Sequence, residues 1–237
     1  MRTLNLFVLV LVSVTCSQAQ QFIPKAGLVA TTTTATNFVS ELDNSVSYKT
    51  GYTVGLAYTM PVTALGKGLL VIQPEINYIK KGFSIDATGE LLVGGEVPIN
   101  ITTDQHYTLN YIEFPVVAKY EFGSDALRFN IHTGAAIGFA LGGKFESDVT
   151  VTYLDGETPG YSYSGKGDII FYNDDTSNEN LELDHNVDVS WQAGAGITIK
   201  NRLALDLRYG LSLTNLQHEQ DSKNRVLQFT VGVPIGK

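Results

Sequence analysis

The chain has 237 residues, a formal net charge of −8 and a single cysteine. Its acidic balance, without any basic cluster, excludes nucleic acid as an expected partner. Its mean hydropathy is close to zero, which argues against a bundle of membrane helices but is typical of a β-barrel, in which only one face of each strand meets lipid.

Residues 1–19 have the pattern of a secretory signal peptide. Arg2 supplies a positive charge, residues 4–14 form an apolar run too short to span a membrane, and residues 17–19 fit a small-x-small cleavage site. We therefore expect a signal peptide over residues 1–19 and a barrel domain over residues 20–237. Cleavage after Ala19 would leave no thiol in the mature chain. The alternative is lipidation of Cys16, although the residues before it fit a lipoprotein motif poorly.

The rest of the chain repeatedly alternates apolar residues with small or polar ones. In the clearest segment, residues 51–60, one face would carry Tyr52, Val54, Leu56, Tyr58 and Met60. Successive strand side chains point to opposite faces, so this pattern predicts a β-strand with one apolar face. Eight strands are predicted in this way, over residues 23–35, 49–62, 68–83, 106–122, 126–141, 187–200, 202–216 and 225–235.

The predicted strand at 106–122 changes phase at its middle. Apolar side chains occupy odd positions as far as Tyr111 and even positions from Ile112 onward. A slip of one residue moves every side chain to the other face. We therefore expect a β-bulge between Tyr111 and Glu113, which would keep both apolar sets, Leu109 included, on one face.

The predicted connections alternate in length. Short ones lie at 63–67, 123–125 and 200–201, and long ones at 37–48, 84–105, 142–186 and 217–224. Outer-membrane barrels have an even number of strands, short periplasmic turns and long extracellular loops, and a closed barrel satisfies every backbone group within lipid. We therefore predict an all-β, eight-stranded antiparallel transmembrane β-barrel in the outer membrane of a Gram-negative bacterium. The alternative, a soluble barrel or sandwich, would need solvated polar faces where this chain has many Gly and Ala residues.

Three segments resemble a known family. Residues 73–82 (QPEINYIKKG), 109–120 (LNYIEFPVVAKY) and 205–211 (LDLRYGL) are similar to the motifs PE-x-x-Y-x-x-KG, L-x-Y-[LI]-E-[IF]-P and D-x-R-Y of the PorT-like outer-membrane β-barrel proteins of Bacteroidota. The motifs occur in the family order. The resemblance implies the barrel fold, and it raises a role in type IX protein secretion as a function to be tested.

Several charged residues would point into the barrel. They are Glu75, Glu113, Lys119, Glu121, Arg128, Asp206 and Arg208. Eight strands leave an interior just wide enough for side chains to fill, and buried ions are costly unless paired. We therefore predict a salt-bridged plug in which Glu75 and Glu113 contact Arg128 or Arg208. A narrow ion path or gate is the alternative.

The segment at 142–186 contains ten acidic and two basic residues. Functional residues concentrate on loops held by a rigid scaffold, so we interpret this segment as a candidate partner-binding loop, with a merely solvated loop as the alternative. Residues 149–153 and 168–172 could extend strands beyond the membrane as a hairpin. Its candidate contact residues are Tyr153, Tyr161, Tyr163, Phe171, Tyr172, Asp174 and Asp175. The carboxylates around Asp174 do not have EF-hand spacing, so the sequence does not favour a Ca²⁺ site.

The sequence does not indicate an enzyme. It contains no Gly-x-Ser-x-Gly element, no histidine pair with metal-ligand spacing and no cofactor motif. The expected function is therefore a non-enzymatic one: a plugged membrane anchor whose extracellular loops bind a partner, as in an accessory subunit of a larger outer-membrane complex. Its expected partners are outer-membrane lipid and another outer-membrane or secretion-system protein. The alternatives are a type IX secretion component, a small pore, and an enzyme with its site at the barrel rim.

Overall fold

The computed structural model describes residues 20–34, 43–93, 97–171, 181–183, 186–215 and 222–236, so the expected signal peptide lies outside the described residues. No helix within these ranges has the length and hydropathy to cross a bilayer. The strands are β1 (Gln21–Thr33), β2 (Asp43–Leu65), β3 (Gly68–Val93), β4 (Val97–Gly123), β5 (Leu127–Tyr153), β6 (Tyr161–Phe171), β7 (Leu181–Leu183), β8 (Val187–Ile199), β9 (Leu203–Ser212) and β10 (Asn224–Gly232).

Eight of these strands form a closed ring. Antiparallel pairing runs in the order β1, β2, β3, β4, β5, β8, β9 and β10, and β10 pairs with β1. Such a ring leaves no unpaired strand edge at membrane depth. The predicted all-β antiparallel architecture is confirmed.

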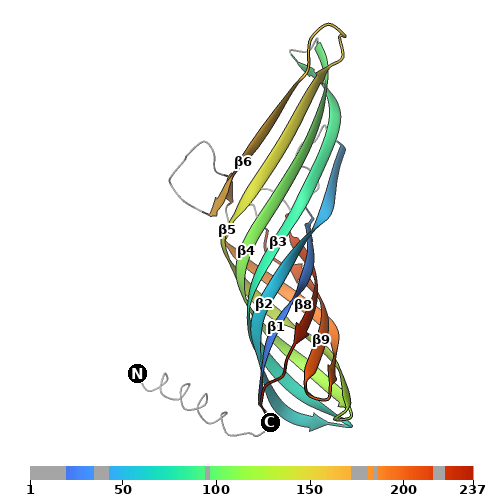
Figure 1. Ribbon diagram of the computed structural model, residues 1–237, viewed down its shortest axis with the longest axis vertical. Coiled ribbons are helices and arrows are strands. Elements are labelled where there is room, and N and C mark those ends of the chain that lie inside the picture. Colours follow the sequence, from blue (N-terminus) through green and yellow to red (C-terminus); the bar gives the residue numbers. More distant parts are fainter. Residues whose placement is uncertain are drawn as a thin grey trace, which may run out of the picture.

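Tight turns join the strands at one end of the ring, which we call the turn end. Lys200 and Asn201 have φ angles of 49° and 52°, the combination that a two-residue type I′ hairpin turn requires. The other turns at this end join β2 to β3 and β4 to β5, at the predicted short connections. Both described ends of the chain also lie here, where Phe22 bridges to Ile235 (Figure 1).

Within the ring, side chains alternate as predicted. On β2 the side chains of Tyr52, Val54 and Leu56 are exposed on the outside, whereas Thr53 and Ala57 are buried inside. β5 and β9 follow the same rule, with exposed aliphatic and aromatic residues opposite buried polar or small ones. The outside of the ring is therefore apolar and the inside polar, which is the polarity of a membrane barrel.

One half of the ring is much longer than the other. β8, β9, β10 and β1 have 13, 10, 9 and 13 residues, whereas β2, β3, β4 and β5 have 23, 26, 27 and 27. The long strands continue past the ring as an open sheet, and β6 and β7 extend that sheet beyond β5 (Figure 1).

The expectation of loops at 84–105 and 142–186 is therefore wrong. Most of these residues belong to strands, and β3 pairs with β4 as far as Val93 and Val97. The residues at 149–153 do extend β5, but they pair with the start of β6 and not with residues 168–172. The physical reason is that strands outside a membrane carry polar side chains on their outer face. The alternation of apolar and polar residues from which strands were predicted is therefore lost there.

The register irregularity expected near Tyr111 is present, but the extra residue belongs to β5. Asn110 pairs with Gly142 and Tyr111 pairs with Ala140, which leaves Leu141 without a partner in β4. Beyond this bulge the inward side chains of β5 change from even to odd positions. The bulge thus turns the apolar side chains of upper β5 inward and its charged side chains outward.

β4 keeps one phase throughout, so a second expectation is also wrong. Leu109 and Tyr111 point inward and are fully buried, not exposed to lipid. They belong to an apolar cluster that fills the ring at the end opposite the turns. The cluster consists of Val29, Ile79, Phe83, Ile85, Leu109, Tyr111 and Ile169.

Candidate functional site: the filled interior and the sheet beyond it

The interior below the apolar cluster is organised around the carboxylate of Glu75 on β3. Arg208 on β9 donates to both of its oxygens, at 2.9 and 3.0 Å, in the bidentate geometry that suits a guanidinium. Lys25 on β1 adds a third donor at 2.5 Å. Gln73 and Asn77 donate from positions two residues away on the same strand, at 2.5 and 3.1 Å. A buried carboxylate is tolerated only with such partners.

Arg208 also joins Glu75 to a second acid. Its guanidinium lies 3.4 Å from Asp206 and donates to Gln192 at 3.1 Å. Asp206 in turn lies 3.9 Å from Lys119 and 3.5 Å from Nδ1 of His132. Charged side chains from four strands, β1, β3, β4 and β9, therefore meet at one depth of the ring, with His132 of β5 beside them.

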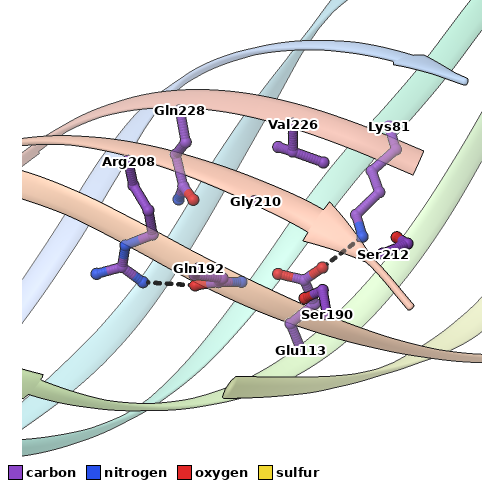
Figure 2. Close-up of a pocket in the computed structure, with 9 residues that line it drawn as sticks. All are labelled: Lys81, Glu113, Ser190, Gln192, Arg208, Gly210, Ser212, Val226 and Gln228. Atoms are coloured by element: carbon purple, nitrogen blue, oxygen red, sulfur yellow. Dashed lines mark hydrogen bonds and ion pairs between the residues drawn. The ribbon is translucent and has the colours of Figure 1, made fainter. Parts of the chain in front are cut away.

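A separate cluster lies between this network and the apolar cluster. Lys81 on β3 lies 2.5 Å from Glu113 and 2.8 Å from Asp188, and its ammonium stands 4.6 Å from the ring centre of Tyr111. Figure 2 shows Lys81 pointing toward Glu113 and Arg208 toward Gln192, around one cavity. That cavity has a volume of about 10 Å³, which is room for about one water molecule.

The interior is wider near the turn end. A cavity of about 220 Å³ is lined there by Glu121 and Arg128, among other residues, and these two side chains lie 3.6 Å apart. Toward the other end the next cavity, beside Lys25 and Lys119, holds about 20 Å³. The interior of the ring therefore narrows from a small vestibule to water-sized gaps.

All seven charged residues predicted to face the interior have an oppositely charged partner there. The expected contact of Glu75 with Arg208 forms, but Glu113 contacts Lys81, and Arg128 contacts Glu121. Three further charged residues of the interior, Lys25, Lys81 and Asp188, were not among those predicted. The alternation that placed Glu75 and Arg208 inside also places Lys81 and Asp188 there, so the signal was present.

The ion pairs of the described interior balance in charge. Their acids are Glu75, Glu113, Glu121, Asp188 and Asp206, and their bases are Lys25, Lys81, Lys119, Arg128 and Arg208. Selective ion pathways are lined by side chains of one predominant sign. A neutral network in which every acid has a cationic partner has the character of a plug.

A closed ring of strands with an apolar outer surface and an interior of paired charges is typical of an outer-membrane barrel, and a known family matches the chain. The family model described as "Outer membrane protein beta-barrel domain" matches residues 17–218. The chain belongs to this family. It is therefore an outer-membrane protein, and in the orientation usual for such barrels the turn end faces the periplasm and the open sheet faces outward.

Solved outer-membrane barrels are also similar to the chain, at low identity. The attachment invasion locus protein Ail of Yersinia pestis, solved with a heparin analogue, is 12% identical with a TM-score of 0.39, covering 91% of this chain and 99% of its own. The outer membrane enzyme PagL is 15% identical with a TM-score of 0.46, covering 90% and 99%. Neisserial surface protein A is 8% identical with a TM-score of 0.38, covering 90% and 96%. No curated protein matches the chain.

The extracellular sheet has two chemically different faces. Its inner face continues the barrel interior and carries apolar residues that include Ile85, Ile99 and Val151, all buried. Its outer face carries hydroxyl and carboxylate side chains in rows that cross the strands. One row is Ser45, Asp86, Asp104, Asp148 and Ser164, and the next is Thr88, Thr102, Thr150 and Ser162.

The predicted contact residues separate on this sheet. Tyr161 and Tyr163 on β6 are 58% and 66% exposed, and Tyr153 ends β5. Phe171 is half-buried and packs against the apolar cluster, and its role as a contact residue stays a prediction. The other candidates, Tyr172, Asp174 and Asp175, lie outside the described residues, as does the candidate Ca²⁺ segment. Within the described ranges, no group of three His, Cys, Asp or Glu residues has metal-binding geometry.

The turn between β5 and β6 is organised by one carboxylate. Asp155 accepts hydrogen bonds from the hydroxyl of Thr158 at 2.5 Å and from the amides of Glu157 and Thr158 at 3.1 and 3.0 Å. These bonds, the Thr158 hydroxyl first, hold the pKa of Asp155 below its ordinary value. The turn is therefore stabilised at neutral pH and loses this support as the pH falls through that lowered pKa.

A hydroxyl, an imidazole and a carboxylate also meet on the outer face, which the sequence analysis did not anticipate. Ser84 Oγ lies 2.7 Å from Nδ1 of His106, and Nε2 of His106 lies 3.5 Å from Asp104. A catalytic triad places the serine on Nε2 and the acid on Nδ1. The order of the nitrogens is reversed here, so we interpret the contact as a cross-strand pair that stabilises the sheet.

Proposed function

We propose that the protein is a sealed outer-membrane anchor that holds an extracellular sheet in place for a protein partner, without catalysing a reaction. The observation that carries the proposal is the pairing of a charge-balanced interior, which narrows to gaps of about 10 and 20 Å³, with strands that continue far beyond the ring. A pore would need an open interior, which this ring lacks at its middle. A barrel with no role outside the membrane would not need strands that continue beyond the ring.

Two finer assignments belong to the same proposal. The three motifs at 73–82, 109–120 and 205–211 support a place among the PorT-like barrels of Bacteroidota. Residues 1–19 support export by a cleaved signal peptide. An accessory subunit of a larger outer-membrane complex fits both features. A type IX secretion component or a small pore is the competing function, and the following two experiments separate them.

We expect the intact protein to give no stepwise ionic conductance in planar lipid bilayers. The reason is that the cavities beside Lys25 and beside Lys81 have room only for isolated water molecules, at about 20 and 10 Å³. Fluorescence of Trp191, which faces lipid, verifies insertion in the same preparation. Reproducible conductance steps from inserted protein would contradict the sealed anchor and favour transport.

We expect a tagged protein to recover a stoichiometric partner from gently solubilised native outer membranes, and to lose it when the β5–β6 hairpin is shortened. Asp148 pairs with Ser164, so residues 149–163 can be replaced by an Asn-Gly turn without disturbing the register below. The matched control shortens the neighbouring hairpin at the Thr88–Thr102 pair, removing residues 89–101. A partner absent from all samples, or retained by the first variant, would contradict the proposed role of this hairpin.

A further inference from the structure

β6 has an open edge along most of its length. On one side it pairs with β5 from Tyr161 to Ile169. On the other side β7 meets it only at Ile169–Phe171, so in the part of the chain that the structure describes residues 161–168 have no second strand beside them. Figure 1 shows β6 running along the margin of the extracellular sheet. About half of the backbone N–H and C=O groups of such a segment point away from its one neighbour.

This edge lacks the usual protection against pairing. Exposed edges are normally blunted by proline, by bulges or by several charged residues. Residues 161–168 read YSYSGKGD, with no proline and with two charges, Lys166 and Asp168, and the pairing of β5 with β6 has no register shift. Two tyrosines are among the most exposed large side chains of the protein. The segment is extended, regular and accessible.

The same edge already accepts a strand at its lower end. Leu181–Leu183 adds to β6 in parallel, residue for residue from Ile169 to Phe171. The ladder position beyond Ile169 continues directly from this pairing. An occupant of that position must supply alternating backbone donors and acceptors, which only an extended polypeptide does.

The inner and outer faces of the sheet next to this edge indicate which side chains a bound strand should carry. On the inner face Tyr161 and Tyr163 offer aromatic surface. On the outer face beyond the ring the sheet carries six acids and two lysines: Asp86, Glu90, Asp104, Glu146, Asp148 and Asp168, with Lys144 and Lys166. At the rim below them, Lys49 is close enough to Glu146 and Lys80 for its charge to interact with both, so the outer face is acidic on balance. A strand that alternates apolar and basic residues would match both faces.

We propose that the open edge of β6 binds an extended segment of a partner protein by β-strand addition, and that this segment alternates apolar and basic residues. The inference rests on the proposed partner-binding function and names its mode. Backbone hydrogen bonds supply the affinity, and the tyrosines and the acidic outer face select the sequence. The edge needs no cofactor and no residue of the interior network.

The test uses the full-length protein in lipid nanodiscs and an octapeptide of alternating valine and lysine. In a Cys16→Ser background, Ser164→Cys carries a fluorescent label at the β6 edge. Ser45→Cys, at the other end of the same cross-strand row, carries it at the opposite edge. A second peptide with alternate amides N-methylated keeps every charge and side chain but loses the donors along one edge.

The expected result is saturable quenching at position 164 and none at position 45, with binding weakened at least about tenfold by N-methylation, since each 1.4 kcal/mol of lost interaction is tenfold in affinity. Tyr161→Ser with Tyr163→Ser should weaken it similarly, whereas Tyr48→Ser, an equally exposed tyrosine on β2, should not. Equal binding of the N-methylated peptide would overturn the proposal by showing simple charge attraction.

Two further outcomes would also overturn it. Quenching at position 45 would assign binding to β2. A concentration-dependent signal at position 164 without peptide would show that a second copy of the chain occupies the edge. Recovery of the native partner by a protein that fails the peptide test would reject strand addition yet leave the proposed function in place, whereas loss of both would reject the function itself.

Discussion

Replacing Arg208 with methionine should lower the free energy of unfolding by about 3–5 kcal/mol, the usual cost of removing one partner from a buried ion pair. Arg208 holds both oxygens of Glu75 and also contacts Asp206 and Gln192. Without it, Glu75 keeps only Lys25 as a charged partner and Asp206 loses its nearest cation. The measurement is urea unfolding in phospholipid vesicles, followed by the fluorescence of Trp191.

The matched control is Arg202→Met, since Arg202 is exposed beside the turn that follows β8. It should leave the midpoint of unfolding nearly unchanged. Adding Glu75→Gln to Arg208→Met should cost less than the two single losses together, because the partners act on each other. Equal stability of Arg208→Met and the parent protein would mean that the network does not close the barrel.

Replacing Lys81 with methionine should be comparably destabilising, for a different reason. One ammonium serves two acids, Glu113 and Asp188, so its loss leaves two buried carboxylates without their cation, again at about 3–5 kcal/mol. Because protonation removes a charge that has lost its partner, the deficit should be largest at neutral pH and should shrink as the pH is lowered. Unfolding is measured in vesicles over a series of pH values.

The adjacent Lys80 provides the control, because it lies on the same strand with its side chain on the opposite face. Lys80→Met should change stability little and without this pH dependence. Adding Glu113→Gln and Asp188→Asn to Lys81→Met should restore much of the lost stability at neutral pH. A deficit in Lys81→Met that stays constant from neutral to acid pH would argue for lost packing against Tyr111, not for stranded charge.

The ring could be predicted from the sequence because lipid imposes a strict alternation. The segments at 51–60 and 126–141 show it without interruption, and both lie in the ring as expected. The upper halves of β3, β4 and β5 could not be found by the same rule. Their outer faces meet water and carry polar residues such as Asp86, Thr102 and Asp148. Without apolar residues at those positions, the sequence was interpreted as loops.

The interior charges were predictable as a set, but not as pairs. Alternation tells which residues face inward, yet the height of each residue depends on strand tilt and on the stagger between strands, which no short pattern encodes. Glu113 therefore meets Lys81 and not Arg128. The prediction that Leu109 and Tyr111 face lipid was wrong for a related reason. Near the barrel rim an apolar side chain can face either lipid or an apolar core, and the sequence does not distinguish the two environments.

The unequal ring sets a fixed stand-off from the bilayer. β4 has 27 residues, of which roughly 12 suffice to cross about 30 Å of hydrocarbon at the usual tilt. The remainder is on the order of 50 Å of continuous strand. That length clears the lipid headgroups on one side of the barrel only, above β2–β5. A partner bound there would be held at a fixed height above the bilayer and on a fixed side of the barrel. No flexible linker would lose conformational freedom when it binds.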